Sequence, residues 1–451
     1  MRSLHADAFN HDEYASDYDA DVLREEDPIR TGYADALEWT ASFLNAGPQS
    51  TVCDLGSGTG NLTARLPRTR RLYGVDVSRA MSARARSKLG RRPDVEWVED
   101  DLLAFVHRDD LPPLDAVGST YALHHLADEE KTVFFGKVRE RLGPGGAVAF
   151  ADLMFADAAS RGERLAGYRA SGRGALADEI EAEFFWDLKG AEAALRSLGF
   201  ATVTHRFSDL SWGLAGRLPG ARPKIKVCCI TSVEEAEIAL RAGADALGLV
   251  SSMPSGPGVI EDAEIARIAR GVGGRADTVL LTCRTDPAAI AGQVRAAGVT
   301  TVQLCDRLPE GAHAALRAAL PDTVIIGVVH VAGEGSIAEA EKLDGRVDAI
   351  LLDSGRPDAA ELGGTGRVHD WAVSRRIREV VAAPVYLAGG LTPDNVAHAA
   401  ETVAPYGLDA CSGLRENGRL CGGRLASFFA RLEGDVLAPR ATAAGGRGGA
   451  R

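Results

Sequence analysis

The sequence predicts an α/β protein of two domains, an open doubly wound sheet followed by a closed eight-stranded barrel. Short apolar runs alternate with amphipathic stretches along most of the 451 residues, which is the pattern of strands joined by helices. One core rarely grows beyond about 250–300 residues, so this length favours more than one domain. The alternation pauses in a stretch rich in Gly, Pro and Arg over residues 213–223. We therefore expect domains at residues 1–219 and 222–437, and a disordered low-complexity tail at 438–451.

The composition excludes several classes of protein. The formal net charge is −12 and neither half is basic, which argues against nucleic acid as a partner. No apolar run approaches the roughly 18 residues that cross a bilayer, and the first residues are not those of a secretory signal. The seven cysteines form no CxxC pair and no Cys/His cluster, so no metal is expected. We expect a cytoplasmic protein that acts on small molecules; the sequence carries no signal of its oligomeric state.

A glycine-rich turn follows the first expected strand, Thr51–Leu55. The turn contains Gly56, Gly58 and Gly60 and leads into a helical stretch, so its backbone N–H groups can approach a ligand closely. Asp76 ends the next expected strand, where a carboxylate can accept hydrogen bonds from ribose hydroxyls. The turn therefore predicts a nucleoside site, although dinucleotide dehydrogenases carry a similar pattern.

Further motifs narrow this prediction. Asp54 precedes the turn, giving DLGSGTG, and the third glycine comes too early for GxGxxG. Asp101 in VEDDLL, DAVGSTYALHHL and LGPGGAVAFADL follow. Over residues 9–212 this order resembles the class I S-adenosylmethionine-dependent methyltransferases, which implies a Rossmann-like domain. The resemblance implies that Asp54 and the three glycines hold the methionine part of S-adenosylmethionine, Asp76 the ribose and Asp101 the adenine.

The resemblance extends to the opening segment FNHDEYASDYD, which is similar to the lid helix of small-molecule methyltransferases and would place Tyr14 and Tyr18 near the cofactor. No catalytic base is expected: His124 and His125 follow a strand where the acceptor should lie, but one of two adjacent histidines in such a loop is usually just a solvated side chain. The aromatic run 184–186 could line the acceptor pocket, although such clusters more often lie in a core. Methyl transfer often needs only proximity and in-line geometry. A dehydrogenase, or a nucleotide-binding domain without catalysis, is the alternative.

The second half contains eight strand-like runs separated by helical stretches. They are IKVCCI, ADALGLV, TVLLTC, TVQLC, TVIIGVVHV, VDAILLD, PVYLAGG and GLDACSG. Eight such units in about 210 residues suit a TIM (β/α)8 barrel, in which chemistry lies at the carboxyl ends of the strands. Alternation in the first run directs Ile225, Val227 and Cys229 toward the helices, and Lys226 and Cys228 into the barrel mouth.

Candidate acid–base groups lie at two of these strand ends. Cys228 stands beside the ammonium of Lys226, which favours a base or nucleophile. Asp353 ends an apolar run, where a carboxylate is expensive to bury without a purpose. Small residues end the last two runs, where backbone N–H groups can converge on a phosphate; these residues are Gly389, Gly390, Ser412 and Gly413.

The same motifs carry a second resemblance. KVCCIT is similar to the opening KICGIT of the phosphoribosylanthranilate isomerases, and ADALGLV, VQL, ILLD, GGTGRVHDW, LAGGLTPDNV and GLDACSG follow in that family's order. The resemblance implies an Amadori rearrangement, as in tryptophan biosynthesis, with Cys228 as general base, Asp353 as general acid and no cofactor. A loop of Gly364, Thr365 and Gly366 would close over the substrate.

The chain departs from that family at informative positions. Gly258 stands where the family has an arginine that meets the substrate carboxylate, Cys229 replaces a glycine, and Cys305 and Asp306 replace the end of QLHG. Loss of the arginine should weaken binding of a carboxylated substrate by about 1.5–3 kcal/mol. We expect a bifunctional enzyme. The alternatives are a specialised pathway in which the barrel accepts another phosphosugar amine, and a chain in which one module is a non-catalytic binding domain.

Overall fold

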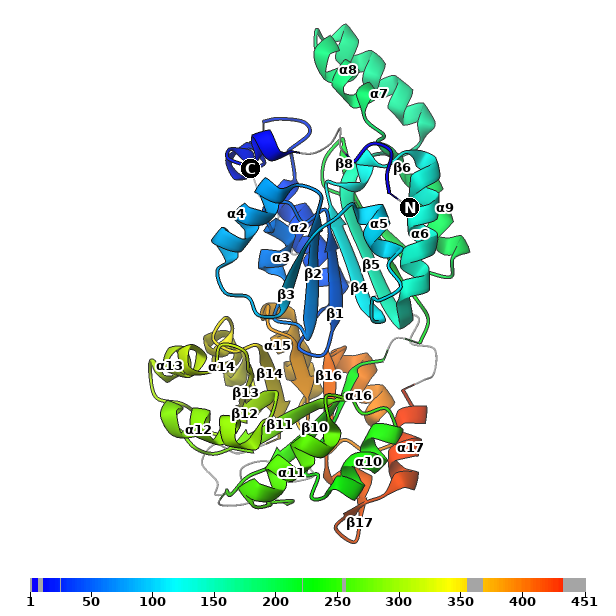
Figure 1. The fold of residues 1–451 in the computed structure, drawn as a ribbon. Coiled ribbons are helices and arrows are strands. Elements are labelled where there is room, and N and C mark those ends of the chain that lie inside the picture. Colours follow the sequence, from blue (N-terminus) through cyan, green and yellow to red (C-terminus); the bar gives the residue numbers. More distant parts are fainter. Residues whose placement is uncertain are drawn as a thin grey trace. The chain divides into compact units, whose positions relative to one another are not determined.

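The computed structural model describes residues 2–6, 11–24, 26–220, 222–253, 257–354 and 368–432 (Figure 1). The expected tail at 438–451 and the expected substrate loop at 364–366 lie outside these ranges. The chain divides into two compact units, and the division between them falls at Ala221 and Arg222. Within the described part of the chain, no helix combines the length and apolar character needed to span a bilayer.

The first unit is built on an open sheet of eight strands. They are β1 (Thr51–Leu55), β2 (Arg71–Asp76), β3 (Val95–Glu99), β4 (Leu114–Thr120), β5 (Leu142–Phe155), β6 (Trp186–Asp187), β7 (Ala201–Arg206) and β8 (Ser211–Arg217). The order is β3-β2-β1-β4-β5-β8-β7, with the short β6 also paired to β5. The first five strands are parallel, whereas β8 runs antiparallel to both β5 and β7. This is the predicted doubly wound sheet.

Helices cover both faces of this sheet. They are α1 (Tyr18–Asp21), α2 (Tyr33–Leu44), α3 (Asn61–Arg65), α4 (Arg79–Leu89), α5 (Leu102–Val106), α6 (Asp128–Arg141), α7 (Ala158–Ala170), α8 (Gly174–Ala182) and α9 (Leu188–Ser197), with 3-10 turns η1 (Asp12–Tyr14) and η2 (Leu123–His125). The central strand β1 is buried throughout. Its Val52 packs with α2 and α3, whereas Cys53 and Leu55 pack with α5 and α6. The alternation along one strand therefore supplies two separate cores.

The second unit is a closed barrel of parallel strands, which confirms the predicted TIM fold. Its strands are β9 (Lys224–Val227), β10 (Ala246–Val250), β11 (Asp277–Thr282), β12 (Thr301–Leu304), β13 (Val324–His330), β14 (Ala349–Asp353), β15 (Val385–Leu387) and β16 (Gly407–Ala410). Each strand pairs with the next, and β16 closes onto β9. The outer helices are α10 (Val233–Arg241), α11 (Asp262–Val272), α12 (Pro287–Ala297), α13 (Ala312–Ala319), α14 (Gly335–Leu343), α15 (Trp371–Val380), α16 (Val396–Val403) and α17 (Gly422–Ala430).

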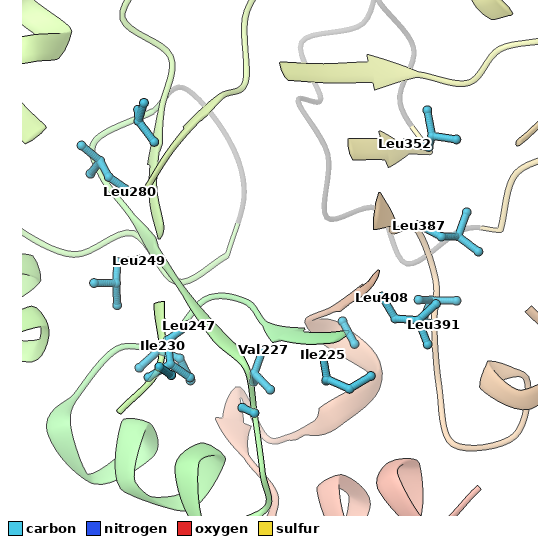
Figure 2. Packing of buried hydrophobic residues seen from close by; sticks show 14 of the residues in the cluster. Ile225, Val227, Ile230, Leu247, Leu249, Leu280, Leu352, Leu387, Leu391 and Leu408 are labelled. Atoms are coloured by element: carbon cyan, nitrogen blue, oxygen red, sulfur yellow. The ribbon is translucent and has the colours of Figure 1, made fainter. Parts of the chain in front are cut away.

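Two apolar layers hold the barrel together. Alternate strand residues such as Leu247, Leu249 and Leu352 pack outward against the helices (Figure 2). The residues between them, such as Ala246 and Val250, form a smaller cluster inside the barrel. The last strand leads through η3 (Ser412–Leu414) into a hairpin of β17 (Arg415–Glu416) and β18 (Arg419–Leu420). The closed sheet brings the carboxyl ends of all eight strands to one mouth.

Candidate active sites

A cavity of about 580 Å³ lies at the carboxyl ends of β1, β2 and β4, a volume in the range of small-ligand sites. From β1 the sheet extends through β2 to β3 on one side and through β4 to β5 on the other, so the strand order switches between β1 and β4. Open α/β sheets bind ligands at such a switch point. Of the predicted cofactor residues, Gly56, Gly58, Asp76 and Asp101 border the cavity. Asp54 and Gly60 do not.

The backbone of the glycine turn adopts left-handed conformations. Gly56, Gly58 and Gly60 have φ of +71°, +52° and +79°, which residues with a Cβ rarely adopt. A Cβ on Gly56 would lie 2.2 Å from Cβ of Ala122. At Gly58 a Cβ would meet no atom within 4 Å, so this part of the turn faces open space. Gly60 is the N-cap of α3, which explains why it lies outside the cavity wall.

Asp54 lies behind the turn and is fully buried. Its Oδ2 accepts a hydrogen bond of 2.6 Å from Oγ1 of Thr63. Its Oδ1 is buried and has no hydrogen-bond partner among the described residues. Burial, with a smaller contribution from the charge of Asp76, raises the pKa of Asp54 to about 7. A buried carboxylate oxygen without a hydrogen bond costs free energy of folding unless a donor or a cation approaches it.

The two other predicted carboxylates are held by backbone N–H groups. Asp76 accepts hydrogen bonds from N of Gly58 (2.7 Å) and from N of Ser78 (2.8 Å). Oδ1 of Asp101 caps α5 through N of Ala104 (2.9 Å) and also accepts from N of Ser3 (3.0 Å). A carboxylate oxygen can accept more than one hydrogen bond, so both groups keep acceptor capacity toward the cavity.

The N-terminal segment is anchored to the rim of the cavity. Asp12 accepts hydrogen bonds from Oγ of Ser78 (2.5 Å) and N of Ala80 (3.0 Å), at the start of α4. Asp19 accepts from Oγ1 of Thr59 (2.5 Å) in the glycine turn and pairs with Nζ of Lys88 (3.0 Å). Tyr14 and Tyr18, expected near the cofactor, both border the cavity. These contacts place the segment where a lid would be.

The two histidines at the end of β4 differ in burial, with His124 buried and His125 partly exposed. His124 is buried, and its Nδ1 lies 2.5 Å from Oδ1 of Asp152 on β5. Its Nε2 lies 3.2 Å from Oε2 of Glu183. Burial disfavours the charged imidazole, but the two carboxylates together raise the pKa of His124. His125 borders the same cavity. The partners of His124 were not predicted because both acidic residues lie far away in the chain.

The aromatic run divides between the cavity and the core. Phe185 borders the cavity, in agreement with the alternative in which the run lines a pocket. Trp186 is buried in the core beneath α6 and α9. The ring of Phe184 lies 4.8 Å from the ring of His5. Only Phe185 is therefore placed to meet a ligand.

In the barrel, a buried ion pair stands beside the predicted base. Lys226 is fully buried, and its Nζ donates to Oδ2 of Asp409 (2.8 Å) and to Sγ of Cys228 (3.4 Å). Lys226 and Asp409 are direct neighbours in the pairing of β9 with β16. Burial opposes the charged ammonium, but Asp409 and Cys228 hold the pKa of Lys226 above its usual value. Sequence reasoning found Lys226 and Cys228 but not Asp409.

The position of Cys229 differs from the expectation. Ile225 and Val227 pack with the helices as predicted, but β9 ends at Val227 and Cys229 has φ of +64°. Cys229 therefore packs with the interior cluster instead of the helices, and its Sγ lies 2.8 Å from Sγ of Cys411. A Cβ on Gly258 would lie 2.5 Å from Cβ of Cys229. Two of the three departures from the family, at Gly258 and Cys229, therefore lie in contact.

Arg415 secures this turn, and sequence reasoning missed it. Its guanidinium donates to the carbonyl oxygens of Cys228 (3.3 Å) and Cys229. It also forms an ion pair with Glu235 of α10, with Nη1 and Oε1 3.0 Å apart and both side chains nearly buried. The carboxylate of Glu235 also accepts from N of Leu420 (2.9 Å). This network positions the carboxyl end of β9.

Asp353, the predicted acid, ends β14 at the same end of the barrel as Cys228. The strands β15 and β16 separate β14 from β9 around the sheet, so the two residues approach the mouth from well-separated strands. Oδ1 of Asp353 accepts from N of Ser354 (2.7 Å). Burial raises the pKa of Asp409, and the ammonium of Lys226 opposes part of this shift.

The predicted phosphate residues lie on two touching loops after β15 and β16. Gly389 and Gly390 have φ of +84° and +64°. A Cβ on Gly413 would lie 2.1 Å from the carbonyl oxygen of Leu391, so the loops approach closely enough to require glycine. Ser412 is exposed at the start of η3.

Comparison with known proteins matches each unit to a family model. Residues 52–146 match the model of a methyltransferase domain, and residues 225–430 match that of N-(5'phosphoribosyl)anthranilate (PRA) isomerase. The chain is 39% identical over 219 residues to N-(5'-phosphoribosyl)anthranilate isomerase 2 of Methanosarcina mazei, covering 48% of this chain and 97% of that protein. It is 38% identical over 198 residues to the isomerase of Halobacterium salinarum, covering 42% and 86%.

A solved structure of phosphoribosyl anthranilate isomerase from Thermus thermophilus is 28% identical, with a TM-score of 0.41, and the match covers 46% of this chain and 98% of that one. The relative from Methanosarcina mazei is spanned almost completely by the barrel half of this chain. Through residues 225–430 the chain therefore belongs to the N-(5'-phosphoribosyl)anthranilate isomerase family, and it is an enzyme that joins this barrel to a methyltransferase domain.

Proposed function

We propose that the barrel catalyses the Amadori rearrangement of an N-(5'-phosphoribosyl) aryl amine, the reaction of tryptophan biosynthesis, and that the first unit transfers a methyl group from S-adenosylmethionine to a small molecule. For the barrel, the observation that carries the proposal is the pair Cys228 and Asp353 at the carboxyl ends of two strands of one closed sheet. A family relationship over the whole barrel supports it.

In this mechanism Asp353 donates a proton to the furanose ring oxygen. The bond from this oxygen to the anomeric carbon breaks as the nitrogen lone pair forms an iminium. Cys228, as thiolate, removes the proton from the adjacent carbon, and the electrons of that bond form an enolamine. The enolamine then tautomerises: the former anomeric carbon gains a proton, the hydroxyl on the adjacent carbon loses one, and the ketone forms. The buried ammonium of Lys226 donates a hydrogen bond of 3.4 Å to Sγ of Cys228, which fixes the position of the sulfur.

The phosphate group would lie on the touching loops of Gly389, Gly390, Ser412 and Gly413. Their left-handed glycines direct backbone N–H groups without interference from a Cβ. The phosphate contact anchors the sugar so that its first two carbons face the acid and the base. Acid and base catalysis of this kind contributes about 10²–10⁴-fold each, and neither step calls for a cofactor.

The test is isomerisation of N-(5'-phosphoribosyl)anthranilate by the full chain. Cys228→Ser should lower kcat/KM by at least about 100-fold, while Cys421→Ser, at a thiol outside the barrel mouth, should not change it. Asp353→Asn should lower kcat by a similar factor and leave KM nearly unchanged. Equal turnover by Cys228→Ser and the parent would refute the role of the thiol.

A second candidate substrate class has its own supporting observation. Gly258 has φ of +75° and lies against Cys229, so an arginine could not occupy this place without displacement of the thiol. A phosphosugar amine without a carboxylate would suit such a pocket. Growth of an isomerase-deficient tryptophan auxotroph supplied with this chain separates the two classes: full growth supports the carboxylated substrate, and absence of growth by a folded chain supports the other.

Two features of the first unit support a site for S-adenosylmethionine. The glycine turn faces free space at Gly58, and behind the turn the buried Oδ1 of Asp54 has no hydrogen-bond partner among the described residues. When bound, the cofactor supplies an electrophilic methyl group. The turn would hold its methionine part with Asp54 behind, and Asp76 and Asp101 would hold the ribose and the adenine. Methyl transfer then requires that the acceptor be positioned in line.

Calorimetry with S-adenosylhomocysteine and the full chain tests this part. Asp76→Ala should weaken binding by about 10–150-fold, the range of one charged hydrogen bond. Asp178→Ala, at an exposed carboxylate of α8, is the matched control. No heat from the parent at high ligand concentration would favour a non-catalytic module.

A further inference from the structure

Three side chains at the acceptor end of the cavity gather donor atoms of the kind that metals prefer. One ligand atom each from His124, His125 and Glu183 lies within 4.8 Å of the others, and this group is the only such set among the described residues. His11 of the N-terminal segment adds a fourth donor, because its Nε2 lies 3.4 Å from Nε2 of His125. All four residues border the same cavity.

We propose that His124, His125 and Glu183, together with His11, bind a divalent transition-metal ion, for which Zn²⁺ is the best match. Two imidazoles with a carboxylate form a donor set that suits zinc and other first-row metals, and a third imidazole strengthens this preference. Calcium and magnesium prefer oxygen ligands and do not suit three ring nitrogens.

The spacing of the donors fits tetrahedral zinc. Zinc–nitrogen and zinc–oxygen bonds of about 2.0–2.1 Å in a tetrahedron place neighbouring ligand atoms about 3.3–3.4 Å apart. Nε2 of His124 lies 3.2 Å from Oε2 of Glu183, and Nε2 of His11 lies 3.4 Å from Nε2 of His125. The ligand atoms of His124, His125 and Glu183 lie at most 4.8 Å apart, so closure of this trio around an ion requires only movement of side-chain ends.

A partner beyond the ligands orients His124. Its Nδ1 lies 2.5 Å from Oδ1 of Asp152, which leaves Nε2 directed to the cluster. The other oxygen of Asp152 accepts from N of Leu123 (2.9 Å) and N of His124 (3.1 Å), so the carboxylate is itself fixed. A carboxylate that holds the far nitrogen of a histidine is the usual support of a zinc ligand.

The four groups also make contacts that need no metal. Nε2 of His11 lies within hydrogen-bond distance of Nε2 of His125, and His124 pairs with Glu183. These two pairs alone predict no affinity for metal ions.

An ion at this place would also limit the chemical class of the methyl acceptor. This consequence rests on the proposed methyl transfer. The four ligands lie on the cavity wall, so a hydroxyl group of a molecule in the cavity can bind the ion in place of His11 or as a fifth ligand, since catalytic zinc has three protein ligands and can expand to five-coordinate. A hydroxyl bound to zinc loses its proton near neutral pH, which supplies the activation that a missing general base would otherwise provide. The acceptor class is therefore an oxygen nucleophile that can bind a metal.

The test uses the full chain, stripped with a chelator and titrated with Zn²⁺ alone, in the absence of methyl donor and acceptor. Success or failure is therefore independent of the methyl-transfer proposal. Thiolates are zinc ligands in general, so the site is assigned by difference: the parent should bind one ion more than the double variant His125→Ala/Glu183→Gln. His313→Ala, on α13 of the barrel, is the control and should bind as the parent does.

Replacement of zinc by Co²⁺ reports the ligands directly, because a tetrahedral site of imidazoles and carboxylate gives visible absorption without the near-ultraviolet bands of thiolate ligands. Asp152→Asn should weaken this site about 10–100-fold while it keeps the spectrum. Circular dichroism verifies that the variants fold; if the double variant fails to fold, Glu183→Gln alone, at a partly exposed side chain, replaces it. Equal metal content in parent and variant, or thiolate bands alone, would overturn the proposal.

Discussion

Replacement of Asp54 by asparagine should stabilise the first unit at alkaline pH, although the carboxylate stands behind a ligand site. The side chain is fully buried, one oxygen has no hydrogen-bond partner among the described residues, and burial raises its pKa to about 7 from 3.8. A raised acid pKa means that the folded state binds the proton more tightly than the unfolded state. Its contribution to stability is therefore complete below about pH 3.8 and is lost as the pH rises through about 7.

The magnitude follows from the difference between the two pKa values. About three pKa units correspond to about 4 kcal/mol in the free energy of unfolding. Most of this change, about 2–3 kcal/mol, falls between about pH 5 and pH 8.5. Asparagine does not titrate, so the free-energy difference between variant and parent should grow by that amount over this range. Above about pH 8 the net gain is smaller than 4 kcal/mol, because the amide leaves a buried group unpaired at a cost of about 1–3 kcal/mol.

Hydrogen exchange followed by mass spectrometry on the full chain can measure this effect. Peptides that cover β1 and β2 report the opening free energy of the first unit, and peptides from β11 and β12 of the barrel serve as the internal control. The variant should protect the first set more at about pH 8.5 than at about pH 5, relative to the parent, and leave the second set unchanged. A difference that does not vary with pH would refute the reasoning, since it would mean that Asp54 is not titrating in the folded protein.

Two further predictions concern the barrel, with stability measured by the same exchange experiment on peptides of β9 and β10. Gly258→Ala should destabilise the barrel by at least about 1 kcal/mol, because its Cβ would lie 2.5 Å from Cβ of Cys229. In the background Cys229→Gly this cost should fall by about 1 kcal/mol or more, and additive effects would contradict the contact. Arg415→Met should cost about 3–5 kcal/mol by leaving the buried Glu235 unpaired. Its control, Arg424→Met, breaks an exposed pair with Glu416 and should cost less than about 1 kcal/mol; similar losses in both variants would show that the buried pair has no special role.

Local rules were enough to predict the two folds from the sequence. The two-residue alternation of strands depends on neighbours in the chain, so it placed Ile225 and Val227 on the helix side of β9. The glycine turn after β1 was predictable for the same reason, since left-handed φ angles favour glycine wherever they occur. Local rules failed at Cys229, where a left-handed residue ends the alternation and turns the thiol toward the interior.

Contacts between distant parts of the chain were decided only by the tertiary structure. Asp409 meets Lys226 across 183 residues because β16 pairs with β9 in one particular register. Asp152 meets His124 because β5 lies beside β4, and Glu183 reaches the same histidine from the end of α8. A residue pattern states which side chains leave a strand on the same face, but strand order and register decide which of them meet. The residue types of both sites could therefore be predicted from the sequence. Their partners, and the charges that those partners bring, were decided by strand order and register in the open sheet and the closed barrel.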